Sequence, residues 1–283
     1  MNYRHIYHAG NICDVVKHAT LALLITHLRS KETGFTILDT HAGCGSYDLD
    51  DPRAQQTGEA DTGVRKVWAS AAAATPELAP YLDVLRAINP DEVLRTYPGS
   101  PVLARRMMRP QDSLIACELH PEDAHILRRQ FRGDAQAQVH HRDGYGAPKA
   151  FLPALKKRGL ILIDPPFEQP DEFDALTHAA EAIHAALPQA VVALWYPVKE
   201  RPTIWRFHEA LLAAGLPKLL VAEFIFHPET RSDRLNGSGF IIMNPPWKLE
   251  EQLSVLFPAL HALLETEAQE SAVKRLGPDE EHK

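Results

Sequence analysis

The stretch that decides the fold reads Gly159-Leu160-Ile161-Leu162-Ile163-Asp164-Pro165-Pro166-Phe167. Its apolar run is long enough for one buried strand and far too short to span a membrane. The two prolines lack a backbone N–H and fix φ, so the strand must end there and the following turn must be stiff. Asp164 is therefore predicted at the rim of a sheet, with Phe167 just beyond it. Open α/β sheets bind their ligands at this place, the carboxyl end of a buried strand.

Strands and helices alternate along the rest of the chain. Strands are predicted at residues 35–39, 113–118, 137–141, 160–163, 190–195, 218–226 and 238–243. Helices are predicted at residues 14–28, 100–108, 121–132, 146–157, 171–187, 200–214 and 248–265. This alternation predicts an α/β fold with a Rossmann-like, mostly parallel sheet of seven strands. No helix separates the last two strands, so the last strand is predicted to pair antiparallel.

One segment interrupts the alternation. More than 70 residues separate the strand at 35–39 from the strand at 113–118, where one helix would suffice. We interpret residues 48–97 as an inserted small helical subdomain, and residues 1–47 and 98–266 as the Rossmann-like domain. Residues 267–283 alternate charged and small side chains, which predicts a flexible tail.

The composition limits the classes of function. The chain has 283 residues and a formal net charge of −7, whereas sequence-independent nucleic-acid binders are usually strongly basic. Its three cysteines form no Cys-x-x-Cys pair, so we expect neither disulfides nor a metal site. The N-terminus lacks the layout of a signal peptide, and no run approaches the roughly 20 apolar residues of a membrane helix. These features favour a cytoplasmic protein.

Acidic side chains end four of the predicted strands: Asp39, Glu118, Asp143 and Asp164. The carboxyl ends of parallel strands share one edge of a sheet. Glycines in the loop at residues 40–46 permit a ligand to approach the backbone closely. Glu118 suits the hydroxyl pair of a ribose, and Asp143 suits the amino group of an adenine. The loop lacks the G-x-G-x-x-G spacing and the chain has no Walker lysine motif, which disfavours a dinucleotide or a nucleoside triphosphate.

This pattern resembles the class I S-adenosylmethionine-dependent methyltransferases, and residues 164–167 resemble the (Asp/Asn)-Pro-Pro-(Tyr/Phe/Trp) motif of amino-group methyltransferases. Over about residues 1–260 the chain is similar to the RlmJ family, the bacterial 23S ribosomal RNA adenine-N6 methyltransferases. The segments that carry the similarity are Tyr3-Arg4-His5, His8-Ala9-Gly10-Asn11, Asp14-Val15-Val16-Lys17-His18, Asp39-Thr40-His41-Ala42-Gly43, Tyr97-Pro98-Gly99-Ser100-Pro101, Glu118-Leu119-His120-Pro121, Leu160 to Phe167, Leu194-Trp195-Tyr196-Pro197-Val198, and Asn244-Pro245-Pro246-Trp247-Lys248-Leu249-Glu250.

The resemblance implies S-adenosyl-L-methionine as methyl donor, S-adenosyl-L-homocysteine as product and 23S ribosomal RNA as partner. The positions that it assigns to the cofactor are His18, His41, Ser100, Glu118, Asp143, Gly144 and Asp164. Tyr3 matches a position that contacts RNA, and Lys17 is expected as a second contact. We further expect a monomer that acts on naked or early-assembly RNA.

The mechanism that we expect follows from the residue types. An adenine amino group is a poor nucleophile because its lone pair is delocalised into the ring. Asp164, the catalytic residue, and the carbonyl of Pro165 would accept hydrogen bonds from the N6 hydrogens and position the nitrogen. Phe167 would stack on the flipped-out base, a contact worth about 1–3 kcal/mol.

Four basic patches are candidates for phosphate contacts: Arg105-Arg106 with Arg109, Arg128-Arg129 with Arg132, Lys156-Lys157-Arg158, and Arg231 with Arg234. The alternative interpretation is a set of solvated helix faces, which we favour for the Arg128 patch. Arg231 and Arg234, in the loop between the last two strands, and the rim of the inserted subdomain are the better candidates for binding RNA.

Asn244-Pro245-Pro246-Trp247 repeats the motif after another strand. Because that strand is predicted antiparallel, its end lies at the opposite edge of the sheet, so we assign it a structural role. Two other functions stay open: a DNA adenine-N6 methyltransferase, and a non-catalytic nucleic-acid-binding or DNA-utilisation protein of the same fold.

Overall fold

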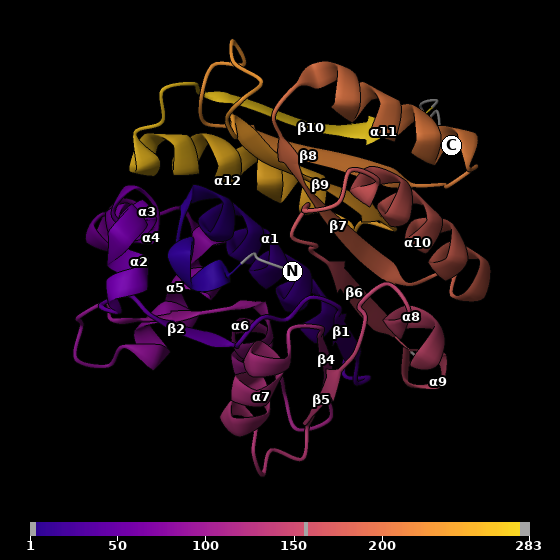
Figure 1. Ribbon diagram of the computed structural model, residues 1–283, viewed down its shortest axis with the longest axis horizontal. Helices are drawn as coiled ribbons and strands as arrows, with labels where there is room; N and C mark the ends of the chain where they lie inside the picture. Colours follow the sequence, from indigo (N-terminus) through magenta and orange to yellow (C-terminus); the bar gives the residue numbers. More distant parts are fainter. Residues whose placement is uncertain (1–3, 156–157, 278–283) are drawn as a thin grey trace.

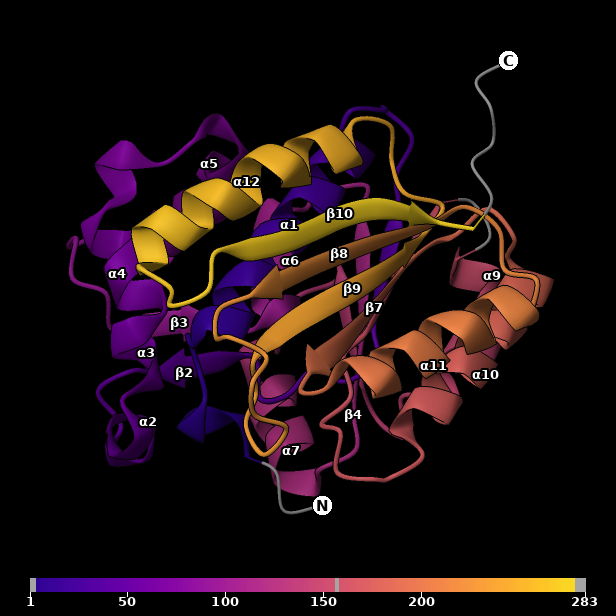
Figure 2. The same cartoon turned by 90° about the horizontal axis from the view of Figure 1, so that it is seen from above.

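A computed structural model describes residues 4–155 and 158–277 of the chain. One twisted sheet with the strand order β10-β8-β9-β7-β6-β1-β4-β5 runs through the molecule (Figures 1 and 2). Its strands are β1 (Thr36–Asp39), β4 (Ser113–Glu118), β5 (Ala137–His141), β6 (Gly159–Ile163), β7 (Val191–Val198), β8 (Leu219–Ile225), β9 (Gly237–Met243) and β10 (Glu270–Leu276). The five adjacent strands β7, β6, β1, β4 and β5 are parallel to one another, and β9 pairs antiparallel with both β7 and β8.

Helices cover both faces of this sheet. The elements α1 (Ile12–Arg29), α5 (Ala79–Ile88), α6 (Ser100–Met107), α7 (Pro121–Gln130) and α12 (Leu249–Leu264) contribute to one hydrophobic core. The elements α8 (Ala147–Ala150), α9 (Leu152–Leu155), α10 (Glu172–Ala186) and α11 (Arg201–Ala213) contribute to the other. The predicted α/β class and mixed sheet are confirmed.

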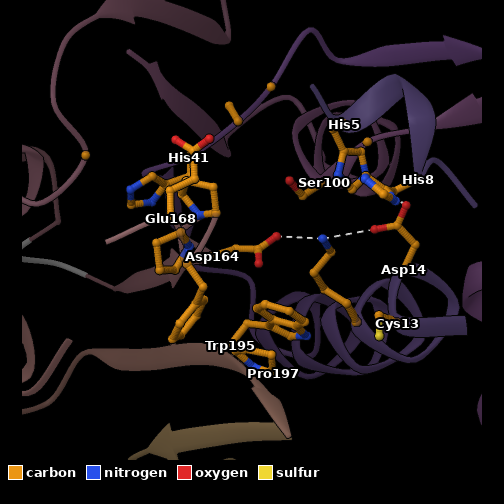
Figure 3. A pocket seen from close by; sticks show the side chains of 18 of the residues that line it. His5, His8, Cys13, Asp14, His41, Ser100, Asp164, Glu168, Trp195 and Pro197 are labelled. Atoms are coloured by element: carbon orange, nitrogen blue, oxygen red, sulfur yellow. Dashed lines mark hydrogen bonds and ion pairs between the residues drawn. The ribbon is translucent and has the colours of Figure 1, made fainter. Parts of the chain in front are cut away.

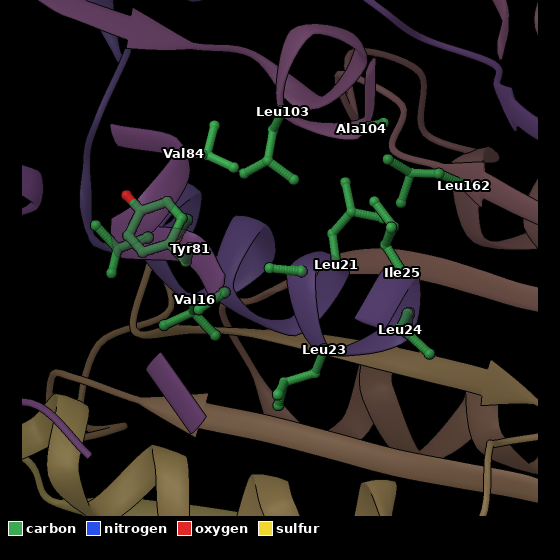
Figure 4. Packing of buried hydrophobic residues seen from close by; sticks show 14 of the residues in the cluster. Val16, Leu21, Leu23, Leu24, Ile25, Tyr81, Val84, Leu103, Ala104 and Leu162 are labelled. Atoms are coloured by element: carbon green, nitrogen blue, oxygen red, sulfur yellow. The ribbon is translucent and has the colours of Figure 1, made fainter. Parts of the chain in front are cut away.

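Most residues of helix α1 are buried. Its apolar residues pack against α5, α6 and the sheet, as Figure 4 shows for Leu21, Val84, Leu103 and Leu162. The side chain of Asn11 caps the helix by accepting a hydrogen bond from the backbone N–H of Asp14 at 2.8 Å. This start places the first turns of α1 beside the carboxyl edge of the sheet.

The inserted segment begins and ends at a small two-stranded sheet. Strand β2 (Ser46–Asp48) pairs antiparallel with β3 (Thr96–Pro98) and so brings the two ends of the segment together. Between them lie α2 (Pro52–Thr57), α3 (Glu59–Thr62), α4 (Val64–Ala69), η2 (Ala71–Ala73), η3 (Pro76–Leu78) and α5. The treatment of residues 48–97 as a subdomain apart from residues 1–47 and 98–266 stays a prediction.

Three sequence predictions were wrong: the number of strands, the flexible tail at residues 270–276 and the single helix at residues 146–157. The described part of the large sheet has eight strands rather than seven, because residues 270–276 of the predicted flexible tail form β10 and pair with the whole of β8. Residues 278–283 of that tail lie outside the described residues. The helix predicted at residues 146–157 is two short helices, since Pro153 has no N–H to bond one turn back and disfavours a helical residue before it.

In the described ranges, no helix is long and apolar enough to cross a membrane.

Candidate active site

The carboxyl ends of β1, β4, β5 and β6 border one cavity of about 750 Å³. Its lining includes every described residue that the sequence assigned to the site: Lys17, His18, His41, Ser100, Glu118, Asp143, Gly144, Asp164, Pro165 and Phe167. Tyr3, the remaining candidate, lies outside the described residues. The structure therefore brings the described candidates together, whereas their roles stay predictions.

Glu118 is held by the loop that follows β1. Its Oε2 accepts a hydrogen bond from the backbone N–H of Gly43 at 2.8 Å, and its Oε1 accepts one from His120 at 2.6 Å. Each oxygen keeps a second acceptor site, which suits a vicinal diol. Burial raises the pKa of Glu118 above its ordinary value, against the effect of these two bonds.

Gly144 forms a close contact that only glycine allows. A Cβ at this position would lie 2.3 Å from the carbonyl oxygen of Thr40 and 2.8 Å from the ring of His41. The neighbouring Asp143 accepts a hydrogen bond from the N–H of Gly146 at 2.8 Å, which orients its carboxylate. The end of β5 and the loop after β1 are thus packed closely at this side of the cavity.

His41 is a neutral ring with a defined tautomer. Burial lowers the pKa of His41 to about 4. The hydroxyl of Thr40 donates its one hydrogen to the carbonyl of Leu162 at 2.9 Å, so Nδ1 of His41 must donate to that hydroxyl at 2.8 Å. Nε2 is left as an acceptor beside Gly144.

Ser100 and His18 join the cavity to buried polar side chains. The Ser100 hydroxyl donates to Asp39 at 2.6 Å, and burial raises the pKa of Asp39 to about 7. His18 Nδ1 lies 2.7 Å from the hydroxyl of Tyr97. Burial lowers the pKa of His18 to about 3, so this ring is also neutral at pH 7.

Asp164, which is labelled near the centre of Figure 3, forms an ion pair with Lys17. The Lys17 Nζ lies 2.6 Å from Oδ2 of Asp164 and 3.0 Å from Oδ1 of Asp14. Asp14 also pairs with Nε2 of His5 at 2.8 Å and accepts a bond from the N–H of Gly10 at 2.9 Å. Burial disfavours its charge, yet His5 and Lys17 hold the pKa of Asp14 well below its ordinary value. Asp164 thus faces a fixed cation from α1.

Phe167 closes the motif with a strained backbone. Its φ is 52°, in the left-handed region that non-glycine residues rarely adopt. The ring packs on Phe173, with centroids 5.0 Å apart, and meets Trp195 edge-on at 5.8 Å. These contacts fix the direction in which Phe167 borders the cavity.

The repeated motif has a different geometry. In Asn244-Pro245-Pro246-Trp247 it is the asparagine that has a positive φ, 51°. Its side-chain amide donates to the carbonyls of Pro188 and Ala190, both at 2.8 Å, at the opposite edge of the sheet. Trp247 is 79% exposed. The structural role predicted for Asn244 is supported.

Carboxylates dominate the charge of the cavity. The described lining has nine of them against two lysines, Lys17 and Lys199, and no arginine. The nine are Asp14, Glu59, Glu118, Asp123, Asp143, Asp164, Glu168, Glu172 and Asp233. Such a lining suits a ligand with cationic groups and repels a polyphosphate. The part of the chain that the structure describes contains no group of three or more His, Cys, Asp or Glu that could hold a metal ion.

Most arginines of the predicted basic patches bind within the protein. Arg105 pairs with Asp134 at 2.6 Å, Arg109 pairs with Asp112 at 3.0 Å, and Arg231 pairs with Asp233 at 2.6 Å. Arg158 donates to the carbonyls of Leu28 and Thr33, and Arg234 donates to the side chain of Asn236. Lys156 and Lys157 lie outside the described residues.

Sequence reasoning assigned no role to two residues of this site. Asp14 lies one helical turn before Lys17 and His18 on α1, so the i, i+3, i+4 spacing could have shown that they share a face. Trp195 lies on β7, beside the strand that ends at Asp164, but its contact with Phe167 depends on the order of strands in the sheet.

Known proteins resemble this chain over most of its length. A family model described as RsmJ, ribosomal RNA large subunit methyltransferase D, RlmJ, matches residues 32–275. The ribosomal RNA large subunit methyltransferase J of Escherichia coli is 41% identical over 93% of this chain and 94% of its own. The protein of the same name from Haemophilus influenzae is 37% identical over 92% of each. A crystal structure of a Legionella pneumophila protein is similar, with a TM-score of 0.87 and 29% identity over 95% of this chain and 98% of that one.

Proposed function

Since this chain belongs to the RlmJ family of ribosomal RNA large subunit methyltransferases, we propose that it transfers a methyl group from S-adenosylmethionine to the N6 amino group of one adenine in 23S ribosomal RNA. One observation carries the proposal. Asp164-Pro165-Pro166-Phe167 and Glu118 border the same cavity, so an amine and a nucleoside cofactor can meet there.

The residues of the cavity fit S-adenosylmethionine. Glu118 has two free acceptor sites for a ribose diol, and the excess of carboxylates suits the sulfonium and ammonium groups of this molecule. Asp143 and Gly144 would hold the adenine, and Ser100, His41 and His18 would border the rest. When bound, the cofactor supplies an electrophilic methyl group.

Asp164 orients the target amine. Its Oδ2 is occupied by Lys17, while Oδ1 has no hydrogen bond to any described residue. The free oxygen and the carbonyl of Pro165 can therefore accept the two N6 hydrogens and turn the nitrogen lone pair toward the methyl donor. The ion pair with Lys17 holds the carboxylate of Asp164 in place, and Phe167 stacks on the base. The released proton passes to Asp164 or to water.

The substrate, oligomeric state and location follow the same proposal. An adenine must leave its stack to reach Asp164, which is easier in naked or early-assembly RNA than in a finished subunit. We propose that the enzyme acts there as a monomer in the cytoplasm.

Purified protein and S-adenosylmethionine labelled in the methyl group test this function. We expect calorimetry to show cofactor binding, and label to appear in N6-methyladenosine after incubation with protein-free 23S ribosomal RNA. Assembled large subunits and DNA of the same sequence serve as controls. Labelled DNA with unlabelled RNA would favour the DNA methyltransferase, and absence of cofactor binding would favour the non-catalytic protein.

A further inference from the structure

Lys199 is a cation at the cavity that has no partner among the described residues. It is exposed and lines the cavity directly after the last residue of β7. The structure gives its ammonium group no hydrogen bond or ion pair within residues 4–155 and 158–277. Lys17, the other lysine of the lining, is held by Asp14 and Asp164.

The arginines near Lys199 are neutralised. Arg201 pairs with Glu223 and with Glu229, the latter at 2.6 Å. Arg231 pairs with Asp233 at 2.6 Å. The loop that we considered for binding RNA therefore presents a cation that already has its counter-charge, which leaves Lys199 as the more available one.

The backbone of Lys199 is fixed. Asn236 is fully buried, and its side-chain amide donates to the carbonyl of Lys199 at 2.8 Å. The backbone N–H of Asn236 donates to the carbonyl of Val198 at 2.9 Å. Lys199 therefore extends from a rigid point, and its flexible side chain has a limited reach.

Lys199 lies on the side of the cavity where we propose that the target base binds. Strand β7 pairs with β6, the strand that ends at Asp164. Trp195 and Pro197 of β7 appear beside Asp164 in Figure 3, and Trp195 contacts Phe167. A base stacked on Phe167 would have its sugar and phosphates near the rim formed by β7.

The charge of the cavity favours a phosphate contact at its rim. Nine carboxylates line the cavity, and six of them are buried or half-buried, so a phosphodiester that followed the base inside would meet like charge. The RNA backbone must then stay at the mouth, where one cation can neutralise it. A protein with a net charge of −7 depends on such local contacts more than a basic RNA-binding protein does.

We propose that Lys199 binds a phosphate that flanks the target adenosine, and so holds the RNA backbone at the mouth while the base enters. The proposal rests on the proposed function and adds the residue that contacts the backbone. Lys199 acts as a binding residue and takes no part in the transfer of the methyl group.

The test compares Lys199→Gln with Arg206→Gln, which removes the same charge from an exposed position of α11 outside the cavity. We expect Lys199→Gln to raise the Kd for a fragment of 23S RNA about tenfold and to lower the slope of log Kd against log salt by about 0.7, the value of one phosphate contact on a single strand. Arg206→Gln should change Kd less than about twofold. Lys199→Arg should restore most of the affinity.

RNA with a neutral methylphosphonate beside the target adenosine makes the test specific. At one of the two flanking positions the neutral group should weaken binding to the wild-type protein about tenfold and binding to Lys199→Gln hardly at all. Equal losses for both proteins at both positions would overturn the proposal, as would an unchanged Kd for Lys199→Gln. Methylation is measured separately, so wild-type protein that binds RNA without modifying it counts against the proposed function and not against this contact.

Discussion

At the scale of single residues, the ion pair of Asp164 and Lys17 is the centre of the site. Both side chains are nearly buried, with exposed fractions of 13% and 8%. A buried charge that loses its partner is strongly destabilising, but Lys17 also pairs with Asp14. The removal of Asp164 should therefore affect catalysis more than folding.

We predict that Asp164→Asn lowers kcat at saturating cofactor by at least about 100-fold, because the neutral amide loses the ion pair with Lys17 and its oxygen is a weaker acceptor for an N6 hydrogen than a carboxylate oxygen is. The matched change is Asn244→Ala in the repeated motif, which removes two hydrogen bonds to carbonyls. It should cost about 1–2 kcal/mol of stability and leave kcat nearly unchanged. Activity that survives the change at Asp164 but not the change at Asn244 would reverse the assignment.

The neutral ring of His18 makes a pH-dependent contribution to stability. Its pKa is about 3 in the folded protein and has the ordinary value of 6.5 when unfolded. Between these values the unfolded state binds more protons, so the contribution is complete above pH 6.5 and is lost as the pH falls. We predict that the difference in unfolding free energy between wild type and His18→Gln shrinks by about 2 kcal/mol from pH 7 to pH 5.

Urea denaturation at the two pH values measures this difference. His125→Gln, at an exposed position of α7, is the matched control and should give a difference that stays constant. A constant difference for His18→Gln as well would show that the ring is not held neutral.

At the scale of elements, the sequence predicted the strands and helices that depend on neighbouring residues. The apolar run of β6 ends at two prolines, and the helical spacing of α1 shows in its sequence, so both were found. Strand β10 was missed because its residues alternate poorly and most are exposed. Strand β10 is stabilised by its antiparallel pairing with β8. This contact joins distant segments of the chain, so the local sequence does not predict it.

We predict that a chain that stops at Ala268 is less stable by at least about 2 kcal/mol. The truncation removes all seven register pairs of β10 with β8 and exposes the edge of a strand whose residues are all buried. The double change Glu270→Ala and Lys274→Ala, at exposed positions of β10, is the control and should cost less than about 1 kcal/mol. Thermal unfolding that is the same for the truncated and full chains would contradict a structural role of β10.

At the scale of the whole molecule, the order of strands explains why residues from separate segments of the sequence could be predicted to form one site. Glu118, Asp143 and Asp164 each lie at or just after the carboxyl end of a parallel strand, so one topological rule placed them together. The rule says nothing about which charges neutralise one another across the fold. The pairing of Lys17 with Asp164, and the carboxylates that bind the predicted RNA-binding arginines, could be seen only in three dimensions.

The central claim is methylation of an adenine in 23S ribosomal RNA through Asp164. The most direct measurement is mass spectrometric mapping of N6-methyladenosine in 23S RNA from a strain that lacks this protein. We predict that one N6-methyladenosine is lost, that the wild-type protein restores it, and that the Asp164→Asn variant, produced at the same level, does not. An unchanged set of N6-methyladenosines in the deletion strain, or full restoration by Asp164→Asn, would contradict the account.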